Sequence, residues 1–288
     1  MNRALAELFE KKAKENNGMY ERALAEIIQS IALLGLSRST FFQKAAFYGG
    51  TALRMLFGLD RFSEDLDFSL LAPDPDFRLT DYFSFMQAEL ASFGLNVEIV
   101  DKMKKIDTTN ESAFLKANTL EQILAIADNQ SFKLNLPPNA VTKIKIETDI
   151  DPPPEASTRV GYIDEPVPFA VRSYDSPSLF AGKMHAVLAR GWKNRVKGRD
   201  WYDFVFYVRK GIPLSLSHLE ARLRQTGHYK DNVALTPDRL SPILLERIDK
   251  VDFQAAKLDV ERFIPRPQDL DVWNKDFFRY MAAKIKFL

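Results

Sequence analysis

Residues 47–54, Phe-Tyr-Gly-Gly-Thr-Ala-Leu-Arg, and residues 61–67, Arg-Phe-Ser-Glu-Asp-Leu-Asp, are the most informative part of this chain. A short apolar run that ends in Gly49-Gly50 predicts a buried strand with a sharp exit into a helix. The second stretch leads into another predicted strand, where Asp65 and Asp67 share one face because strand side chains alternate. A glycine turn before a helix suits phosphate binding, and paired carboxylates suit hard divalent cations. Together they indicate triphosphate chemistry with two metal ions.

The composition is that of a globular protein with a substantial core, with 288 residues of which 46% are hydrophobic. Lys and Arg number 40 and Asp and Glu 39, so the whole molecule is not steered toward nucleic acid. Cysteine is absent, which excludes disulfides, thiolate metal sites and a cysteine nucleophile. The first residues are charged and amphipathic, unlike a signal sequence, and no apolar run is long enough to span a bilayer. We expect a cytoplasmic protein with no membrane partner.

Strand patterns precede residue 173, and helix patterns dominate after it. The predicted strands are residues 45–48, 66–71, 96–104, 114–117, 141–150 and 169–172, with a proline-marked connection over 152–167. The predicted helices are residues 4–16, 20–36, 51–57 and 80–93, then 176–190, 199–209, 215–224, 237–250, 252–263 and 272–287. We therefore predict an α/β (α+β) fold with a small mixed sheet flanked by helices. It divides into an α/β domain over 1–173, including N-terminal helices, and a helical domain over 174–288.

The glycine turn supplies the first group of candidate binding residues. Gly49 and Gly50, at the start of a helix, would hold the β- and γ-phosphates, and the Thr51 hydroxyl would add a donor. Arg54, one turn later, would add a charge-assisted hydrogen bond. The alternative is an ordinary strand-to-helix turn in which glycine relieves crowding. The acidic pair shortly downstream favours the functional interpretation.

Carboxylates supply the second group. Asp65 and Asp67 are candidate metal ligands because they follow each other on one strand face among strongly apolar neighbours. Glu64 has the opposite parity and is not expected to be a ligand. Glu147, on the alternating strand 141–150, is a candidate third ligand of a two-metal site. For both strands the alternative is a solvated polar face, and for Glu147 the two interpretations are equally supported.

The helical part supplies a third group. Lys183 lies at the edge of an apolar helix stripe and is either a functional cation or a surface lysine. Asp200 and Asp203 share one face of an aromatic helix and need cationic partners, for which Lys183, Arg54 and Arg199 are the candidates. The densest basic run consists of Arg190, Lys193, Arg195, Lys197 and Arg199, and it is either a solvated loop or a contact for a phosphate backbone.

With these residues in view, the chain resembles the AbiEii/AbiGii family of toxin nucleotidyltransferases, within the polymerase-β-like superfamily. The matching segments are Gly49 to Arg54, Arg61 to Phe68, the strand Ile144 to Glu147 before a proline turn, Gly182-Lys183, and Arg199 to Asp203. They occur in the family order and span roughly residues 45 to 210. One departure is Gly50, where many superfamily members have serine, so Thr51 would have to supply the hydroxyl contact.

The resemblance implies a nucleotidyltransferase fold and a toxin of an abortive-infection or toxin–antitoxin pair, with a cognate antitoxin as partner. Such an enzyme transfers a nucleoside monophosphate from an NTP to an acceptor, here expected to be the 3′ end of tRNA, with Mg²⁺ or Mn²⁺. By position, Asp65 and Asp67 would be metal ligands, Lys183 a triphosphate contact and Asp203 the candidate base or the residue that orients Lys183. The third carboxylate is less regular in the family, which gives Glu147 less weight.

Two rival interpretations are kept. The acceptor of the nucleotidyl group could be a small molecule such as an aminoglycoside, or a protein side chain, because the near-neutral net charge does not favour RNA. Alternatively, the chain could be a catalytically inactive NTP-binding protein that acts through a partner. Magnesium-dependent NTP binding without turnover would distinguish that class.

Overall fold

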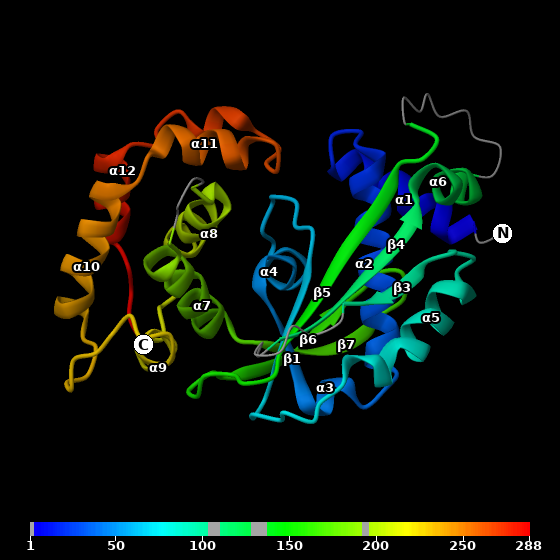
Figure 1. Ribbon diagram of the computed structural model, residues 1–288. Coiled ribbons are helices and arrows are strands. Elements are labelled where there is room, and N and C mark those ends of the chain that lie inside the picture. Colours follow the sequence, from blue (N-terminus) through cyan, green and yellow to red (C-terminus); the bar gives the residue numbers. More distant parts are fainter. Residues whose placement is uncertain (1–2, 103–109, 128–136, 192–195) are drawn as a thin grey trace. The chain divides into compact units, whose positions relative to one another are not determined.

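The computed structural model describes residues 3–102, 110–127, 137–191 and 196–288 (Figure 1). Up to residue 101 its elements are α1 (Arg3–Glu15), α2 (Tyr20–Ser37), α3 (Phe41–Lys44), β1 (Ala45–Tyr48), α4 (Gly49–Phe57), β2 (Leu66–Leu70), the 3₁₀ helix η1 (Leu79–Tyr82), α5 (Phe83–Ser92) and β3 (Glu98–Asp101). Then come β4 (Asn110–Asn118), α6 (Thr119–Ala127), β5 (Val141–Asp149), β6 (Thr158–Ile163) and β7 (Phe169–Tyr174). The last group is α7 (Ser176–Ala189), α8 (Gly198–Arg209), α9 (Leu216–Gln225), α10 (Pro237–Lys250), α11 (Phe253–Glu261), η2 (Pro267–Leu270) and α12 (Lys275–Ala282).

A mixed sheet of seven strands, in the order β3-β4-β5-β2-β1-β7-β6, organises the first part of the chain. The middle strand is β2, which pairs antiparallel with β1 and parallel with β5. The register sets Asp67 opposite Tyr48 on one side and opposite Glu147 on the other. The predicted α/β fold with a mixed sheet flanked by helices is therefore confirmed.

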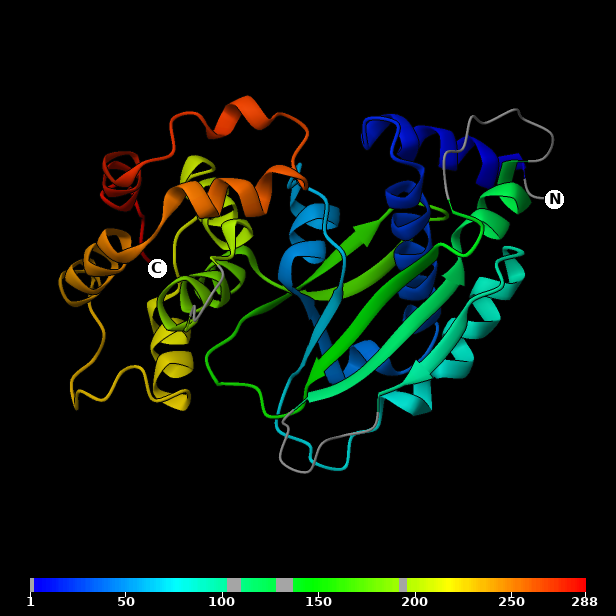
Figure 2. The same cartoon turned by 45° about the horizontal axis from the view of Figure 1, so that its top comes forward.

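The two faces of the sheet differ in chemistry. Leu66 and Phe68 of β2 are fully buried, as are Ile146 and Thr148, their register partners on β5. Helix α2 packs against β5, α1 and α5 and is seen behind the strands in Figure 2. Asp67 of β2 and Glu147 of β5, which alternate with these buried residues, are only half buried, whereas Ser69 at the next alternate position of β2 is buried. Alternation thus separates Asp67 and Glu147 from the apolar side chains of the core.

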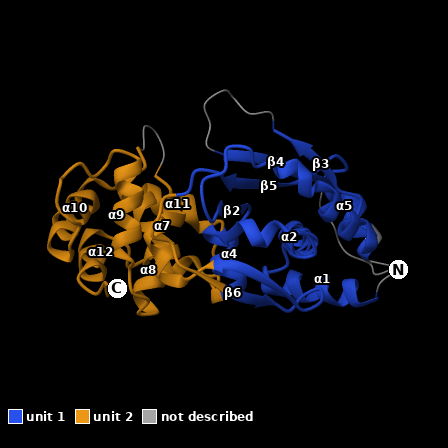
Figure 3. Ribbon diagram, turned by 90° about the horizontal axis from the view of Figure 1, so that it is seen from below, with its two compact units in different colours: residues 1–56, 62–152, 160–173 blue, residues 57–61, 153–159, 174–288 orange. Residues whose placement is uncertain are grey.

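The chain folds into two compact units (Figure 3). Unit 1 comprises residues 1–56, 62–152 and 160–173, and unit 2 comprises residues 57–61, 153–159 and 174–288. Unit 2 has an aromatic core in which the rings of Phe253 and Phe278 stack 4.2 Å apart and the Trp201 ring lies edge-on at 5.0 Å from Phe278. The functional division into a transferase domain over 1–173 and a helical domain over 174–288 stays a prediction.

Several local expectations are wrong in informative ways. The stretch 152–167 contains β6, although prolines at both ends of it favour a connection. The sequence patterns do not predict α3 and α6, because each helix is short and lies directly beside a strand. The last helix is shorter than expected and spans only Lys275–Ala282. Within the described residues, no helix is long and apolar enough to cross a membrane.

Gly198, at the start of α8, is required by close packing. A Cβ on this residue would lie 1.9 Å from the carbonyl oxygen of Ala256 in α11, whereas a Cβ on Gly182 in α7 would have Arg222 Cζ, at 4.0 Å, as its nearest neighbour. We expect Gly198→Ala to lower the free energy of unfolding by about 1–3 kcal/mol, because backbone must move. Gly182→Ala, the matched control, should be neutral or stabilising by up to about 1 kcal/mol. Urea unfolding measures both, and equal effects would refute the packing argument.

Candidate active site

The glycine turn contacts the acidic strand directly. Gly49 begins α4 with φ +80°, a conformation that favours glycine, and a Cβ there would lie 2.4 Å from Asp67 Oδ2. The carboxylate of Asp67 therefore leaves no room for any side chain at position 49. Because Tyr48 is the register partner of Asp67, the strand-to-helix turn is held at this distance by the β1–β2 ladder. The turn predicted to contact phosphate and the predicted metal ligand Asp67 are therefore in direct contact, and both roles stay predictions.

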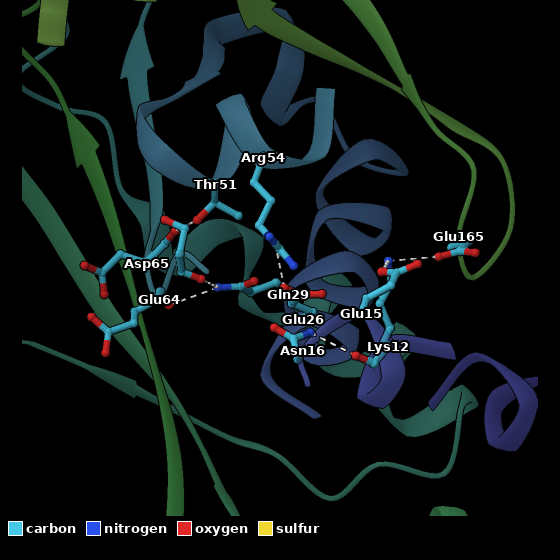
Figure 4. A network of polar contacts seen from close by, with 11 residues as sticks. Lys12, Glu15, Asn16, Glu26, Gln29, Thr51, Arg54, Glu64, Asp65 and Glu165 are labelled. Atoms are coloured by element: carbon cyan, nitrogen blue, oxygen red, sulfur yellow. Dashed lines mark hydrogen bonds and ion pairs between the residues drawn. The ribbon is translucent and has the colours of Figure 1, made fainter. Parts of the chain in front are cut away.

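Three consecutive carbonyl groups before β2 accept hydrogen bonds from two helices. Gln29 Nε2, from α2, donates to the carbonyls of Ser63 at 3.1 Å and Glu64 at 3.0 Å. The Thr51 hydroxyl, from α4, donates to the carbonyl of Asp65. Figure 4 shows Thr51 directed at the backbone of Asp65 while the carboxylate of Asp65 points away. Thr51 is buried, and its hydroxyl positions Asp65, so its predicted hydroxyl contact with phosphate is not the contact that the structure contains.

Arg54 has a different partner from the expected one. Its Nε donates to Glu26 Oε1 of α2 at 2.6 Å, and both side chains are largely buried (Figure 4). This pair ties α4 to α2 and thereby fixes the helix whose first residues are Gly49 and Gly50. A phosphate contact by Arg54 remains a prediction, and the structure provides a structural role for the residue.

Glu147 lies beside Asp67 through backbone register. Its carboxylate has an ion pair with Lys145 at 2.5 Å, and Ser112 Oγ donates to it at 3.4 Å. Asp65 precedes Asp67 by two residues and lies just before the first residue of β2, so its predicted place on the same strand face stays a prediction. Within the described residues, no group of three or more His, Cys, Asp or Glu side chains is gathered tightly enough to hold a metal. The donor set of hard carboxylates fits Mg²⁺ or Mn²⁺, and the Gly49 contact leaves no side chain between turn and ligand.

A buried cluster of charges occupies the start of unit 2. Arg61 Nε and Nη2 donate to the two carboxylate oxygens of Asp203 at 2.6 and 2.7 Å. Lys183 Nζ lies 2.9 Å from both Asp203 Oδ2 and Asp200 Oδ1. Arg190 Nη1 donates to Asp200 Oδ2 at 2.7 Å. The predicted partnership of Lys183 with both aspartates is present, and the second cations are Arg61 and Arg190.

Burial and neighbouring charges act in opposite directions on this cluster. Burial alone would raise the pKa of Asp203, but Arg61 and Lys183 outweigh it and lower the pKa below its ordinary value. Burial would lower the pKa of Lys183, whereas Asp200 and Asp203 raise it. All these side chains are therefore charged at neutral pH. An aspartate that is fully buried, doubly paired and more acidic than usual is a poor proton acceptor, so this geometry favours the alternative in which Asp203 orients Lys183.

The structure describes only part of the predicted basic run. Arg199 lies over the ring of Phe263, 4.3 Å from its centroid. Lys193 and Arg195 of the basic run lie outside the described residues. The run as a phosphate-backbone contact therefore stays a prediction.

Two polar residues were missed by pattern analysis. Gln29 is one, because a single glutamine in an apolar helix gives no signal until its carbonyl partners are known. Arg222 in α9 is the other: its Nε and Nη1 are buried without a hydrogen-bond partner in the described part of the chain. Its guanidinium lies near Gly182, next to Lys183, and burial and the charge of Arg222 lower the pKa of His185 to about 4. Buried guanidinium donors suit an anion.

The fold is that of an α/β protein with a mixed sheet, and a comparison with known protein families gives its class. The family model described as "Nucleotidyl transferase AbiEii toxin, Type IV TA system" matches residues 31–282. The chain therefore belongs to the AbiEii family, which confirms the resemblance drawn from its motifs. A comparison with curated protein sequences finds no match.

Two solved structures are similar to this chain at low sequence identity. JHP933 from Helicobacter pylori is similar with a TM-score of 0.52 and 17% identity, covering 91% of this chain and 90% of that one. A candidate nucleotidyltransferase from H. pylori matches with a TM-score of 0.45 and 18% identity, over 90% of this chain and 92% of that one. The first similarity supports the fold alone, and it extends over nearly the full length of both chains.

Removing one member of the buried cluster should be costly and pH-dependent. We expect Asp203→Asn to lower the free energy of unfolding at pH 7 by about 3–5 kcal/mol, because Arg61 and Lys183 lose their shared counter-charge. The pKa of Asp203 is lowered on folding, so its contribution is present above the unfolded pKa of about 3.9 and is lost as the pH falls through the folded value. The difference between wild type and variant should therefore shrink below about pH 4.

Asp231→Asn is the matched control, because Asp231 has an exposed ion pair with Arg239 at 3.5 Å. Its effect should stay within about 0.5 kcal/mol. Chemical unfolding monitored between pH 3 and 8 gives both curves. A pH-independent difference for Asp203→Asn, or equal effects of the two variants, would contradict the assignment.

Proposed function

We propose that this protein transfers a nucleoside monophosphate from an NTP to an acceptor hydroxyl, with the 3′ end of tRNA as the acceptor. The observation that carries the proposal is the contact between Gly49 and Asp67. It joins a glycine turn at a helix start to a carboxylate on a strand, which are the two components that a triphosphate with bound cations needs. Membership of a nucleotidyltransferase toxin family supports the same chemistry.

Mg²⁺ or Mn²⁺ would be held by Asp65 and Asp67, with Glu147 as the neighbouring third carboxylate. A bound divalent cation would supply charge neutralisation at the phosphates and would make the acceptor hydroxyl more acidic. The backbone of Gly49 and Gly50 would hold the phosphate tail at the start of α4. The acceptor hydroxyl loses its proton to water, and its oxygen forms a bond to the α-phosphorus. The bond between the α-phosphorus and the bridging oxygen of pyrophosphate breaks, and pyrophosphate leaves as the product.

The remaining residues would act through position and charge. Gln29 and Thr51 hold the backbone that leads to Asp65, so they are positioning residues. Lys183 would contact the triphosphate, and Asp203 would fix the orientation of Lys183. Arg222 adds buried donors beside Gly182 and is a further candidate for phosphate contact. The family description also supports a cognate antitoxin as partner, and we expect the protein to act in the cytoplasm.

Labelled substrates test the reaction directly. Incubation of the protein with Mg²⁺, total tRNA and each NTP labelled at the α-phosphate should give labelled tRNA, whereas a γ-phosphate label should appear only in pyrophosphate. Asp67→Asn should reduce labelling at least about 10²-fold, because a displaced or missing ligand misplaces the reacting groups. The measurement is the initial rate of label incorporation.

Glu64→Gln is the matched control, since Glu64 precedes Asp65 but has the opposite strand parity, and Gln29 holds its backbone carbonyl. Its rate should stay within about twofold of wild type. Labelling that survives Asp67→Asn unchanged would refute the proposed site. Transfer of the label to a small molecule or a protein instead of tRNA would refute the proposed acceptor, and saturable NTP binding without any transfer would refute the activity.

A further inference from the structure

Unit 2 contains a cavity that the proposed reaction does not use. It has a volume of about 590 Å³ and is lined by residues of segment 57–61, α8, η2 and α12 and by residues next to them. All of these residues belong to the same compact unit. Pockets of about 300–1,000 Å³ are the size that holds small organic ligands. The cavity is therefore large enough for a ligand with a ring system.

Aromatic side chains form much of the lining, namely Tyr202, Phe206, Trp273, Phe277 and Tyr280. Trp273 is 3% exposed, and its ring lies 6.3 Å from that of Tyr202 between centroids, with the two planes tilted by 44°. The Tyr202 hydroxyl donates to Asp60 Oδ1 at 2.8 Å, which fixes its orientation. Tyr280 is 58% exposed, and Lys284 Nζ lies over its ring, 4.2 Å from the centroid. Aromatic linings suit planar ligands, which stack on aromatic faces.

Charge restricts the ligand further. Four cationic side chains line the cavity: Arg209, Lys210, Arg266 and Lys284. Two carboxylates do so as well, Asp60 and Asp269, and Asp269 pairs with Arg266 at 3.2 Å. Arg209, Lys210 and Lys284 therefore give the lining a positive excess. A purely acidic peptide would be repelled by the two carboxylates. A ligand that combines negative charge, a flat ring and amino donors would match the cations, the aromatic rings and the carboxylates of the lining.

We propose that this cavity binds an unpaired nucleobase together with its phosphate. The base would stack on the aromatic side chains, its amino group would donate to a carboxylate, and its phosphate would face the lysines and arginine. Two sources share this chemistry, a free nucleotide and a nucleotide within a single strand of RNA. The inference rests on the proposed function and extends it, because the second source would make the cavity a holding site for the acceptor strand.

Binding to a catalytically blocked protein tests the cavity apart from the reaction. The full chain carrying Asp65→Asn and Asp67→Asn is titrated into a fluorescein-labelled single-stranded RNA hexamer, and anisotropy gives the dissociation constant. Tyr280→Ala should weaken binding by about 5- to 150-fold, the loss of one stacked base. Lys284→Ala should weaken binding and lower the slope of log K against log salt by about 0.7. Competition with AMP and CMP separates the two sources, because only a pocket open to free nucleotides releases the RNA at low nucleotide concentration.

Two matched controls guard the interpretation. Tyr162→Ala removes another exposed tyrosine, 70% exposed on β6, and Lys230→Ala removes an exposed lysine elsewhere in unit 2. Neither should change the dissociation constant by more than about twofold. Equal binding of a blunt RNA duplex together with no effect of Tyr280→Ala would overturn the proposal in favour of backbone attraction alone. The binding assay requires no transfer of label. A negative binding result therefore says nothing about the proposed transfer reaction, and a negative transfer result says nothing about binding in the cavity.

Discussion

Three hydrogen bonds to consecutive carbonyl groups support the whole arrangement of the acidic strand. The carbonyls of Ser63, Glu64 and Asp65 come just before β2, where the strand ladder has not yet begun. Buried carbonyl groups without partners destabilise a fold, so the hydrogen bonds from Gln29 and Thr51 stabilise this segment. They also fix where β2 begins, and therefore on which face Asp67 projects. A shift of one residue would turn the carboxylate of Asp67 into the core.

The buried charges of unit 2 are held by ion pairs between side chains, whereas the segment before β2 is held by hydrogen bonds to the backbone. A bidentate pair between Arg61 and Asp203 with Lys183 between two aspartates leaves each charge with a geometrically defined partner. Clusters of this kind add little net stability over an apolar core, but they are expensive to break. They therefore specify one arrangement of α7, α8 and segment 57–61. Arg61 is only four residues before Asp65 in the chain. The segment that begins at Arg61 is therefore held by the ion pair of Arg61 with Asp203 at its start and by the hydrogen bond from Thr51 at Asp65.

The sequence predicts what depends on local periodicity and misses what depends on distant partners. Alternation on β2 and β5 was sufficient to separate Asp67 and Glu147 from the buried Phe68 and Ile146. It could not show that the Thr51 hydroxyl turns to Asp65 or that Arg54 pairs with Glu26, since both choices depend on how α4 packs. The partner of Asp203 lies 142 residues away. The sequence pattern could single out Glu147 as a carboxylate on the polar face of β5. Its ion pair with Lys145 became visible only in the side-chain geometry of the structure.

Net charge is a weak argument about partners when charges are segregated. The chain is nearly neutral, with 40 basic and 39 acidic residues, which argued against an RNA acceptor. Yet Asp67 lies opposite Glu147 in register in the sheet of unit 1, and more cations than carboxylates line one cavity in unit 2. Electrostatic attraction decays within about 10 Å at moderate salt, so a polyanion responds to the surface that it meets and not to the sum over the molecule. Balanced composition is therefore compatible with an acidic metal-binding face and a basic nucleotide-binding cavity on the same chain.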